Sequence, residues 1–280
     1  MPENGSSQVV VITGASSGIG LELAQLFAAD GYDLVLAAED DGLDAAAAGC
    51  RAAGVQVWAC QTDLASSAGV QALYEAVLAT GRPVDAAALN AGIGQGGAFV
   101  DTELDALLAV VQLNVVGTTH LARLLLGDMA ARNRGQVLVT SSIASTMPGA
   151  YQAVYNASKS FVQSLVEALQ EELRDTGVTL TSLMPGPTET EFFSRAGMED
   201  TLLGSGPKDD AGAVARQGYD AMRAGQGRVV AASLATKAQE LTAKVLPDTL
   251  KAKMHRQMAE PRGEGPDEAS TDAAAAAETA

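Results

Sequence analysis

Short apolar runs rich in Val, Leu and Ile recur along the chain, separated by longer stretches with helical spacing of apolar residues. The short runs are typical of strands and the longer stretches of helices. The predicted strands are Val9 to Ile12, Leu34 to Ala37, Val55 to Ala59, Val84 to Leu89, Val137 to Thr140, Val178 to Leu183 and Arg228 to Ala231. The predicted helices are Ile19 to Ala29, Ser66 to Ala79, Leu104 to Ala131, Ala153 to Asp175 and Asp210 to Ala224.

Strands that alternate with helices predict a parallel sheet. The strands are nearly continuously apolar, which indicates burial on both faces by helices. We therefore predict an α/β fold, a doubly wound parallel sheet of about seven strands with helices on both faces. Ligands of such sheets bind beyond the carboxyl ends of the strands, so the residues that close each strand are the first functional candidates.

The chain divides by composition into one domain and three flanking segments. We expect one domain at residues 8–232 and a helical appendage at residues 233–260, in which basic and apolar residues interleave. Its position over the sheet edge, at a subunit contact or near the substrate cleft stays open. We expect disorder at residues 1–7, which are polar, and at residues 261–280, an acidic and Ala-rich tail.

Charge and composition exclude several classes of function. The formal net charge of -16 argues against a nucleic-acid partner, which requires a basic surface. Two cysteines and two histidines provide neither a disulfide framework nor a metal site. We find no leader and no apolar run of about 18 residues, so we expect a cytoplasmic protein that is neither secreted nor inserted in a membrane.

A glycine-rich turn follows the first predicted strand and leads directly into a helix. Here Gly14 permits a tight turn, Gly18 lets the backbone approach a pyrophosphate, and Gly20 allows close helix contact. Three glycines also occur in ordinary strand-to-helix turns, but this position favours a Rossmann-type dinucleotide site. The candidate contacts in the turn are Gly14, Ser16, Ser17, Gly18, Ile19 and Gly20.

Tyr155 and Lys159 lie four residues apart at the start of a long predicted helix, on one face of it. A free phenol has a pKa near ~10 and exchanges protons poorly at neutral pH. The ammonium of Lys159 is the candidate cation to stabilise a phenolate at Tyr155. Such a pair also arises by chance, so its interpretation depends on the other motifs.

Several motifs between Val9 and Val230 resemble those of the short-chain dehydrogenase/reductase family. They occur in the family's order and close to its spacing. They are Thr13-Gly14-x-x-x-Gly18-Ile19-Gly20, Asn90-Ala91-Gly92, Asn114, Ser142, Tyr155-x-x-x-Lys159 and Pro185-Gly186. The resemblance implies an oxidoreductase that transfers a hydride between a nicotinamide dinucleotide and an alcohol or ketone. The alternative is a catalytically inactive dinucleotide-binding sensor or scaffold of the same fold.

The resemblance also implies roles for the four catalytic candidates. Tyr155 would be the general acid or base, and Lys159 would bond the nicotinamide ribose. Ser142 stands thirteen residues before Tyr155, which selects it over Ser141, and would position the substrate oxygen. Asn114 would hold a water on a proton path to the lysine, although taken alone it would be an ordinary helix residue.

The expected cofactor is NAD, with NADP as the alternative. Glu39 closes the second strand and can accept hydrogen bonds from the adenosine ribose. The match to the family is imperfect: its NAD-binding members usually have Asp where Ala38 stands, and its NADP-binding members often have Arg where Glu39 stands. Glu39, Asp40 and Asp41 can equally be solvated charges at a helix start. Further contacts implied by resemblance are Asp63, Leu64, Asn90, Ala91, Gly92, Tyr155, Lys159, Pro185, Gly186, Thr188 and Thr190. Asp63 can instead be the N-cap of the next helix.

The substrate site is expected in the loops after Gly92, at residues 144–151 and at residues 191–206. Phe192, Phe193 and Met198 suggest an apolar wall there. The helices Leu104 to Ala131 and Ala153 to Asp175 pair subunits in proteins of the resembled family. A homodimer or homotetramer that binds a small alcohol or ketone is therefore expected.

Overall fold

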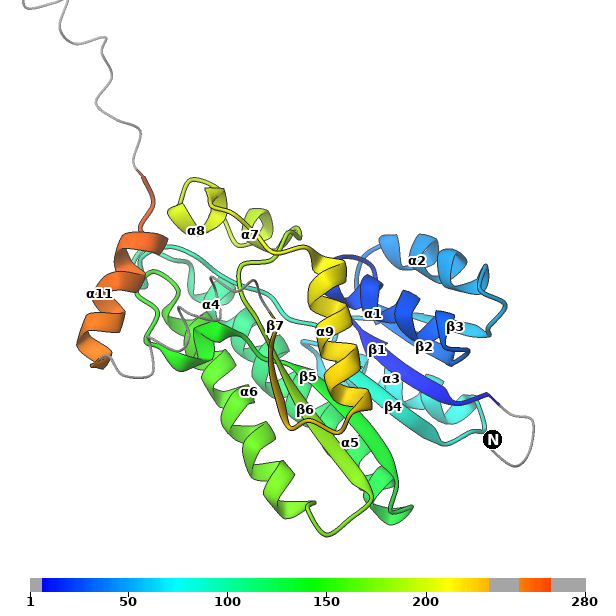
Figure 1. Cartoon of the computed structure of the whole chain (residues 1–280). Coiled ribbons are helices and arrows are strands. Elements are labelled where there is room, and N and C mark those ends of the chain that lie inside the picture. Colours follow the sequence, from blue (N-terminus) through cyan, green and yellow to red (C-terminus); the bar gives the residue numbers. More distant parts are fainter. Residues whose placement is uncertain (1–6, 232–246, 263–280) are drawn as a thin grey trace, which may run out of the picture.

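A computed structural model describes residues 7–231 and 247–262 of the chain. Seven parallel strands form one sheet in the order β3-β2-β1-β4-β5-β6-β7 (Figure 1). The strands are β1 (Val9–Thr13), β2 (Asp33–Ala38), β3 (Val57–Gln61), β4 (Val84–Leu89), β5 (Gly135–Thr140), β6 (Val178–Pro185) and β7 (Arg228–Ala231). The predicted doubly wound α/β fold is confirmed.

The order of the strands reverses beside β1. The chain proceeds from β1 outward to β3, and then returns to place β4 on the other side of β1. A crevice opens at such a reversal, beyond the carboxyl ends of the strands. The fold therefore places the glycine turn after β1 next to the segment that follows β4.

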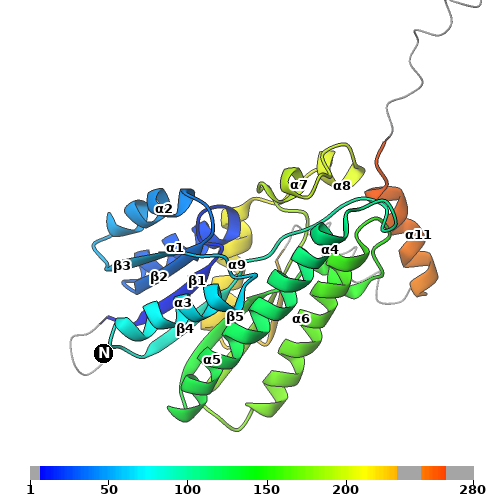
Figure 2. The ribbon, with the colours of Figure 1, turned by 180° about the vertical axis from the view of Figure 1, so that it is seen from behind.

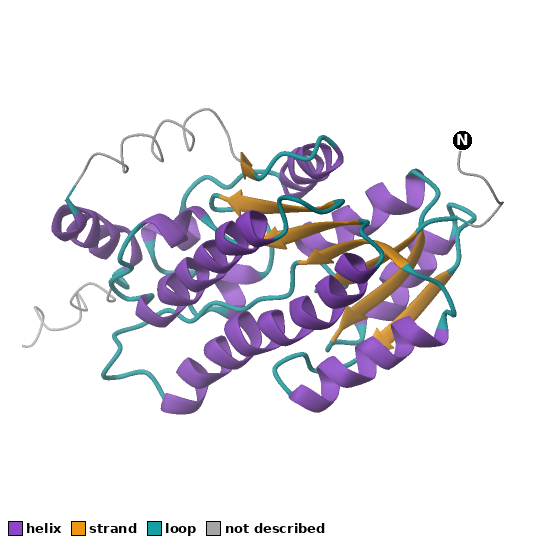
Figure 3. Ribbon diagram, turned by 90° about the horizontal axis from the view of Figure 1, so that it is seen from below, coloured by secondary structure: helices purple, strands orange, loops and turns teal. Residues whose placement is uncertain are grey.

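Helices cover both faces of the sheet (Figure 3). One layer contains α1 (Gly18–Ala29) and α9 (Ala211–Arg223), which pack together through Phe27 and Tyr219, ring centroids 4.8 Å apart. The other contains α3 (Ser67–Ala79), α5 (Thr118–Ala131) and α6 (Ala153–Glu172), side by side in Figure 2. Alternate residues of one strand supply the two cores, because Val11 and Ile12 of β1 belong to different clusters.

Burial on both faces holds in the centre of the sheet but not at its edges. Every residue of β1, β2 and β4 is buried. In contrast, β3 and β7 are the outer strands and expose part of their residues. The prediction of full burial was wrong for these two strands, because an outer strand is covered less completely.

The predicted helix Leu104 to Ala131 forms one continuous helical segment, which consists of three consecutive elements. These are α4 (Leu104–Val111), a π-helical segment (Gln112–Gly117) and α5. By length and composition alone, this is the single helix in the described ranges that is apolar enough to cross a membrane. Leu121, Leu125 and Met129 pack it against the sheet, so it belongs to the helical layer.

Four further helical elements were not delimited from the sequence. They are α2 (Gly42–Arg51), a 3-10 turn at Ile143–Thr146, α7 (Phe192–Arg195) and α8 (Leu202–Ser205). Within the expected appendage at 233–260, α11 (Asp248–Ala259) is helical and lies beside α8 (Figure 1). Residues 232–246, and nearly all of the two ends expected to be disordered, lie outside the described residues.

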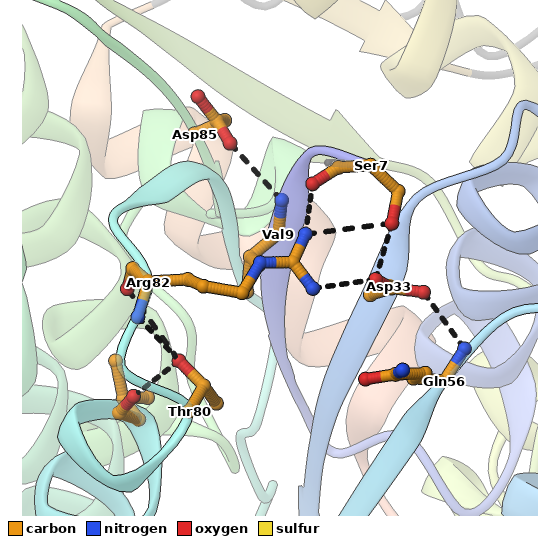
Figure 4. Close-up of polar contacts among 8 residues, drawn as sticks. Ser7, Val9, Asp33, Gln56, Thr80, Arg82 and Asp85 are labelled. Carbon is orange, nitrogen blue, oxygen red and sulfur yellow. Dashed lines mark hydrogen bonds and ion pairs between the residues drawn. The ribbon is translucent and has the colours of Figure 1, made fainter. Parts of the chain in front are cut away.

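The amino ends of the strands are joined by a polar network around Asp33 (Figure 4). The Asp33 carboxylate accepts hydrogen bonds from Ser7, from Arg82 at 2.6 Å and from the Gln56 N–H at 2.7 Å. Burial by itself would raise the pKa of Asp33, but these donors outweigh it and hold the pKa below 3.8. The network lies at the amino ends of the strands, whereas the crevice lies at their carboxyl ends.

Candidate active site

One cavity of about 320 Å³ occupies the crevice at the carboxyl ends of the strands. Such a volume is in the range of small-molecule sites. Sixteen residues named from the sequence line it: Gly14, Ser16, Ser17, Gly18, Ile19, Glu39, Asp63, Leu64, Asn90, Ala91, Gly92, Ser142, Tyr155, Lys159, Pro185 and Gly186. Thr188 and Thr190 line it as well, whereas Gly20 and Asn114 lie behind its wall.

The glycine turn is packed too closely for side chains. Gly14 and Gly18 have φ of +64° and +54°, and a Cβ on Gly18 would lie 2.8 Å from the side chain of Thr190. A Cβ on Gly20 would lie 1.9 Å from the Gly14 carbonyl oxygen, so Gly20 lets the turn close on itself. Since Ser17 makes no side-chain cap at the start of α1, the first N–H groups of that helix are left for an anion.

The acidic residues after β2 differ in their surroundings. Asp40 is half-buried and accepts a hydrogen bond from the Ser16 hydroxyl at 2.8 Å and one from the Gly42 N–H at 3.0 Å. Glu39 is exposed and lines the cavity, while Asp41 is not among the lining residues and accepts from Gln61. Asp40 is the acidic group joined to the glycine turn, which the sequence offered no means to select.

Asp63 and Leu64 line the cavity after β3. The alternative that Asp63 caps α3 is wrong, because the N-cap is Ser66, whose hydroxyl accepts from the Gly69 N–H. Asp63 instead accepts from the Ala65 N–H at 2.8 Å. This turn directs the chain from β3 past the cavity and into α3.

Asn90 joins three strands at their carboxyl ends. Its N–H donates to the Thr13 hydroxyl at 2.9 Å, and its side-chain oxygen accepts from the Thr140 hydroxyl at 3.0 Å. Thr13 closes β1, Thr140 closes β5, and Asn90 follows β4. The segment Asn90 to Gly92 is thereby held against the glycine turn, whose Gly14 approaches Ala91.

Tyr155 and Ser142 meet inside the cavity. Burial raises the pKa of Tyr155 to about 12, and a hydrogen bond with Ser142 acts in the opposite direction. The Ser142 hydroxyl also accepts from the Ala144 N–H at 3.1 Å. Ser141 points elsewhere, since its hydroxyl donates to the Lys159 carbonyl oxygen.

The Lys159 ammonium is directed at the backbone that closes β5. It donates to the Thr140 carbonyl oxygen at 2.9 Å and lies 6.0 Å from the centre of the Tyr155 ring. Burial lowers the pKa of Lys159 to about 8. The two side chains share the cavity, but the environment of the phenol is dominated by its burial.

Asn114 lies in the π-helical segment, 1% exposed, directly behind Gly92 and Lys159. Its side chain accepts from the Ile93 N–H and donates to the Ile93 carbonyl and to the Ser158 hydroxyl. A Cβ on Gly92 would lie 3.1 Å from Asn114 Oδ1 and 3.2 Å from Lys159 Nζ. Gly92 therefore leaves both polar groups room at the cavity wall.

An apolar part of the cavity extends beyond Tyr155. Phe192 packs against Tyr155 with ring centroids 5.1 Å apart, and Phe193 lines the same region. Met198, predicted in this wall, does not line the cavity. It is fully buried beneath the loop at Gly96 and accepts from Gln152.

Two lining residues come from α11, namely His255 and Met258. Nothing in their local pattern connects them with residues more than a hundred positions earlier. The open question of where the appendage lies is answered for α11, which contributes to the lining of the cavity. Ile143, Met147 and Leu203 complete this apolar region.

Comparison with known proteins agrees with this geometry. Residues 8–200 match the family model described as short chain dehydrogenase. Human 17-beta-hydroxysteroid dehydrogenase type 1 is 36% identical over 67% of this chain and 58% of its own length. The glycine betaine reductase ATRR of Emericella nidulans is 33% identical over 67% of this chain, but the match spans 15% of that longer protein.

Solved structures with the same fold include proteins that contain either nicotinamide cofactor. A short chain dehydrogenase/reductase from Burkholderia phymatum in complex with NAD has a TM-score of 0.77 and 28% identity, over 84% of this chain and 92% of that one. A short-chain dehydrogenase from Sphingobium yanoikuyae in complex with NADPH has a TM-score of 0.74 and 28% identity, over 93% and 99%.

Proposed function

Because the chain belongs to the short-chain dehydrogenase/reductase family, we propose that it transfers a hydride between NAD and an apolar alcohol or ketone. One observation carries the proposal: Tyr155, Ser142 and Lys159 share a cavity with a glycine turn whose helix N-terminus has no side-chain cap. A reacting carbon held beside Tyr155 would lie in the same cavity as the nicotinamide ring.

Tyr155 supplies the proton in this mechanism. Since burial raises its pKa to about 12, the phenol is protonated at neutral pH and can donate to a carbonyl oxygen as the carbon receives a hydride. Ser142 donates a second hydrogen bond to that oxygen and holds it in place. The nicotinamide supplies the hydride when the cofactor is bound.

Lys159 and Asn114 support the proton donor. The Lys159 ammonium uses one donor on Thr140 and keeps others for the ribose hydroxyls of the cofactor. Asn114 is the neighbouring amide that positions the cavity wall at Gly92 and Ile93, where a water on the path to Lys159 would bind. Replacement of Tyr155 by Phe therefore removes the donor, while the cofactor contacts of Lys159 and of the glycine turn stay in place.

NAD is the proposed cofactor rather than NADP. Asp40 holds the Ser16 hydroxyl of the glycine turn, and Glu39 lies beside it on the cavity wall. Their carboxylates can accept hydrogen bonds from ribose hydroxyls but repel a phosphate. The lining residues from the turn and from the end of β2 include no Lys or Arg that would neutralise a phosphate, within the described part of the chain.

A homodimer or homotetramer is the proposed assembly. Leu104, Leu108 and Val116 are exposed along α4 and the π-helical segment, and Phe161 is exposed on the adjacent α6. Two copies that pair these helices would remove the four side chains from water.

Light scattering after gel filtration of Leu108→Lys should report a smaller particle than the native chain, and an unchanged mass would reject this surface. A cytoplasmic location and the lack of a nucleic-acid partner remain predictions.

The proposed activity is tested first by binding and then by turnover. NADH at about 100 times its dissociation constant should raise the unfolding free energy by about 2.7 kcal/mol, and NADPH should have a smaller effect at equal concentration. NADH oxidation is then followed with a panel of aryl and alkyl ketones. Tyr155→Phe should lower kcat by about 10²- to 10⁴-fold, with NADH affinity changed by less than about twofold.

Tyr74→Phe is the matched control, because Tyr74 bonds Asp128 on the surface away from the cavity. Full turnover by Tyr155→Phe would reject the mechanism. NADH binding without turnover of any ketone or alcohol would favour the inactive sensor or scaffold. No stabilisation by either nucleotide would reject the cofactor site itself.

A further inference from the structure

The helix α11 is fastened to the loop that precedes α6. The Tyr151 hydroxyl donates to Glu260 at 2.6 Å, and Arg256 pairs with the same carboxylate at 2.9 Å. Ala259 packs in an apolar cluster with Phe193 and Ala196. These contacts hold one face of α11 against the substrate end of the cavity.

His255 is the polar side chain that α11 presents to this cavity. It is 3% exposed, and it lines the cavity together with Met258. Its Nδ1 lies 2.9 Å from the Ala150 carbonyl oxygen. Because a carbonyl can only accept, Nδ1 carries the hydrogen of this bond.

The other ring nitrogen of His255 is left as an acceptor. Within the described residues, Nε2 has no hydrogen-bond partner, and it is not among the fully enclosed polar atoms that lack one. It is therefore not fully enclosed by the described protein atoms. Burial lowers the pKa of His255, while its bond to Ala150 acts in the opposite direction, so the ring is neutral at pH 7.

We propose that His255 is a substrate-recognition residue, whose Nε2 accepts a hydrogen bond from a hydroxyl or N–H group at the end of an apolar substrate remote from the reacting carbon. The inference rests on the proposed function for the position of the reacting carbon at Tyr155. It adds a second polar contact at the opposite end of the substrate and thereby names the substrate class.

The lining between the two polar ends supports this class. Met147, Phe192, Phe193, Leu203 and Met258 are apolar and line the same cavity as Tyr155 and His255. An apolar body would fill this region, and a substrate without a distal donor would bury the Nε2 acceptor unpaired. An unpaired buried acceptor is costly, so the site should discriminate against such a substrate.

NMR of the full chain tests the acceptor without requiring turnover. The chain has two histidines, so ¹⁵N-labelled imidazole spectra are simple, and His120→Gln assigns them. The probes are para-hydroxybenzylacetone, an aryl ketone with a distal phenol, and its methyl ether, each added with NADH. The His255 ring should be in the Nδ1–H form, and its Nε2 resonance should move upfield with the phenol but not with the ether.

Affinity and turnover of the same two probes give the second test. The phenol should bind about tenfold more tightly than the ether. In His255→Asn, whose amide can replace Nδ1 but not Nε2, this preference should fall to about one. In His255→Gln, whose amide oxygen can occupy the Nε2 position, part of the preference should return, and His120→Asn should keep all of it.

The outcomes separate this inference from the proposed function. Equal Nε2 shifts with both probes, or an unchanged preference in His255→Asn, would overturn the role of His255 even if ketones are reduced. A phenol-specific Nε2 shift in a chain that reduces neither probe, nor any ketone of the panel, would support the recognition site and reject the proposed reaction. An Nε2–H tautomer would overturn the inference directly.

Discussion

The glycines of the turn after β1 are required for different reasons, which depend on the atom that each would meet as alanine. Gly18 adopts a positive φ and abuts Thr190, whereas Gly20 has no unusual φ and lies against the Gly14 carbonyl. Likewise, burial moves the pKa of Tyr155 and that of Lys159 in opposite directions. At this scale the chemistry of a residue follows from its nearest atoms.

Gly20→Ala should destabilise the protein by about 1–3 kcal/mol, because its Cβ would overlap the Gly14 carbonyl oxygen and force the turn apart. Urea unfolding gives the free energy, and NADH titration should show weaker binding. Gly49→Ala is the control, since a Cβ there meets nothing within 4 Å and α2 should gain up to about 1 kcal/mol. Equal effects of the two changes would contradict the packing argument.

Asp40→Ser should shift the cofactor preference toward NADPH by about tenfold, because it frees the Ser16 hydroxyl and removes a carboxylate from the turn. The measurement is the ratio of kcat/KM for the two nucleotides. Asp41→Ser, which changes an acidic residue outside the cavity lining, should leave the ratio unaltered. If Glu39→Ser alone shifts the ratio, Glu39 is the ribose ligand and Asp40 is not.

Elements position the site through their interruptions as much as through their regular parts. The π-helical segment inserts between α4 and α5 and turns Asn114 toward the backbone of Ile93. The short α7 places Phe192 on Tyr155, and α11 returns from the end of the described chain to place His255 in the same cavity. Each feature brings a side chain to the ends of the strands that the sheet by itself does not supply.

Asn114→Ala should cost about 2–3 kcal/mol of unfolding free energy, because it leaves the Ile93 N–H and carbonyl groups and the Ser158 hydroxyl without their partner. Turnover should fall as the wall at Gly92 loosens. Gln112→Ala, an exposed change in the same segment, should alter stability by less than about 0.5 kcal/mol. Chemical denaturation of both variants provides the comparison, and a stable Asn114→Ala protein would show that the segment holds its shape unaided.

In the whole molecule, the two ends of the parallel strands carry different features. The carboxyl ends of the strands form the cavity, and the amino ends are joined through Asp33 and Arg82. Asp33 is 4% exposed, so its charge depends on the donors around it. The Asp33 network therefore lies at the opposite ends of the strands from the cavity.

The Asp33 network should make stability depend on acid pH. Because the pKa of Asp33 is lower in the folded chain than its usual 3.8, the network stabilises the fold fully above 3.8 and loses this contribution as the pH falls through the folded pKa. The difference in unfolding free energy between the native chain and Asp33→Asn should therefore shrink below about pH 4. A difference that is constant from pH 7 to pH 3 would mean that Asp33 titrates normally.

The sequence by itself determined the sheet and most of the cavity wall. Buried strands show as continuous apolar runs because hydrophobic burial is a local property of each residue. The motif residues close these strands, and parallel strands place their carboxyl ends together, so the order of the motifs predicts a common site. A strand forms at each of the seven predicted runs, and the predicted site residues line one cavity in the described part of the chain, except Gly20, Asn114 and Met198.

Only the tertiary structure decided the contacts between residues distant in sequence. Asp40 was selected as the ribose candidate by its hydrogen bond to Ser16. Met198 does not line the cavity because it is buried under a loop. His255 lines the cavity because α11 returns to it. The raised pKa of Tyr155 also depends on how much of the molecule surrounds it. Local patterns encode which face of an element is buried, but partner choice and desolvation are set by packing across the whole chain.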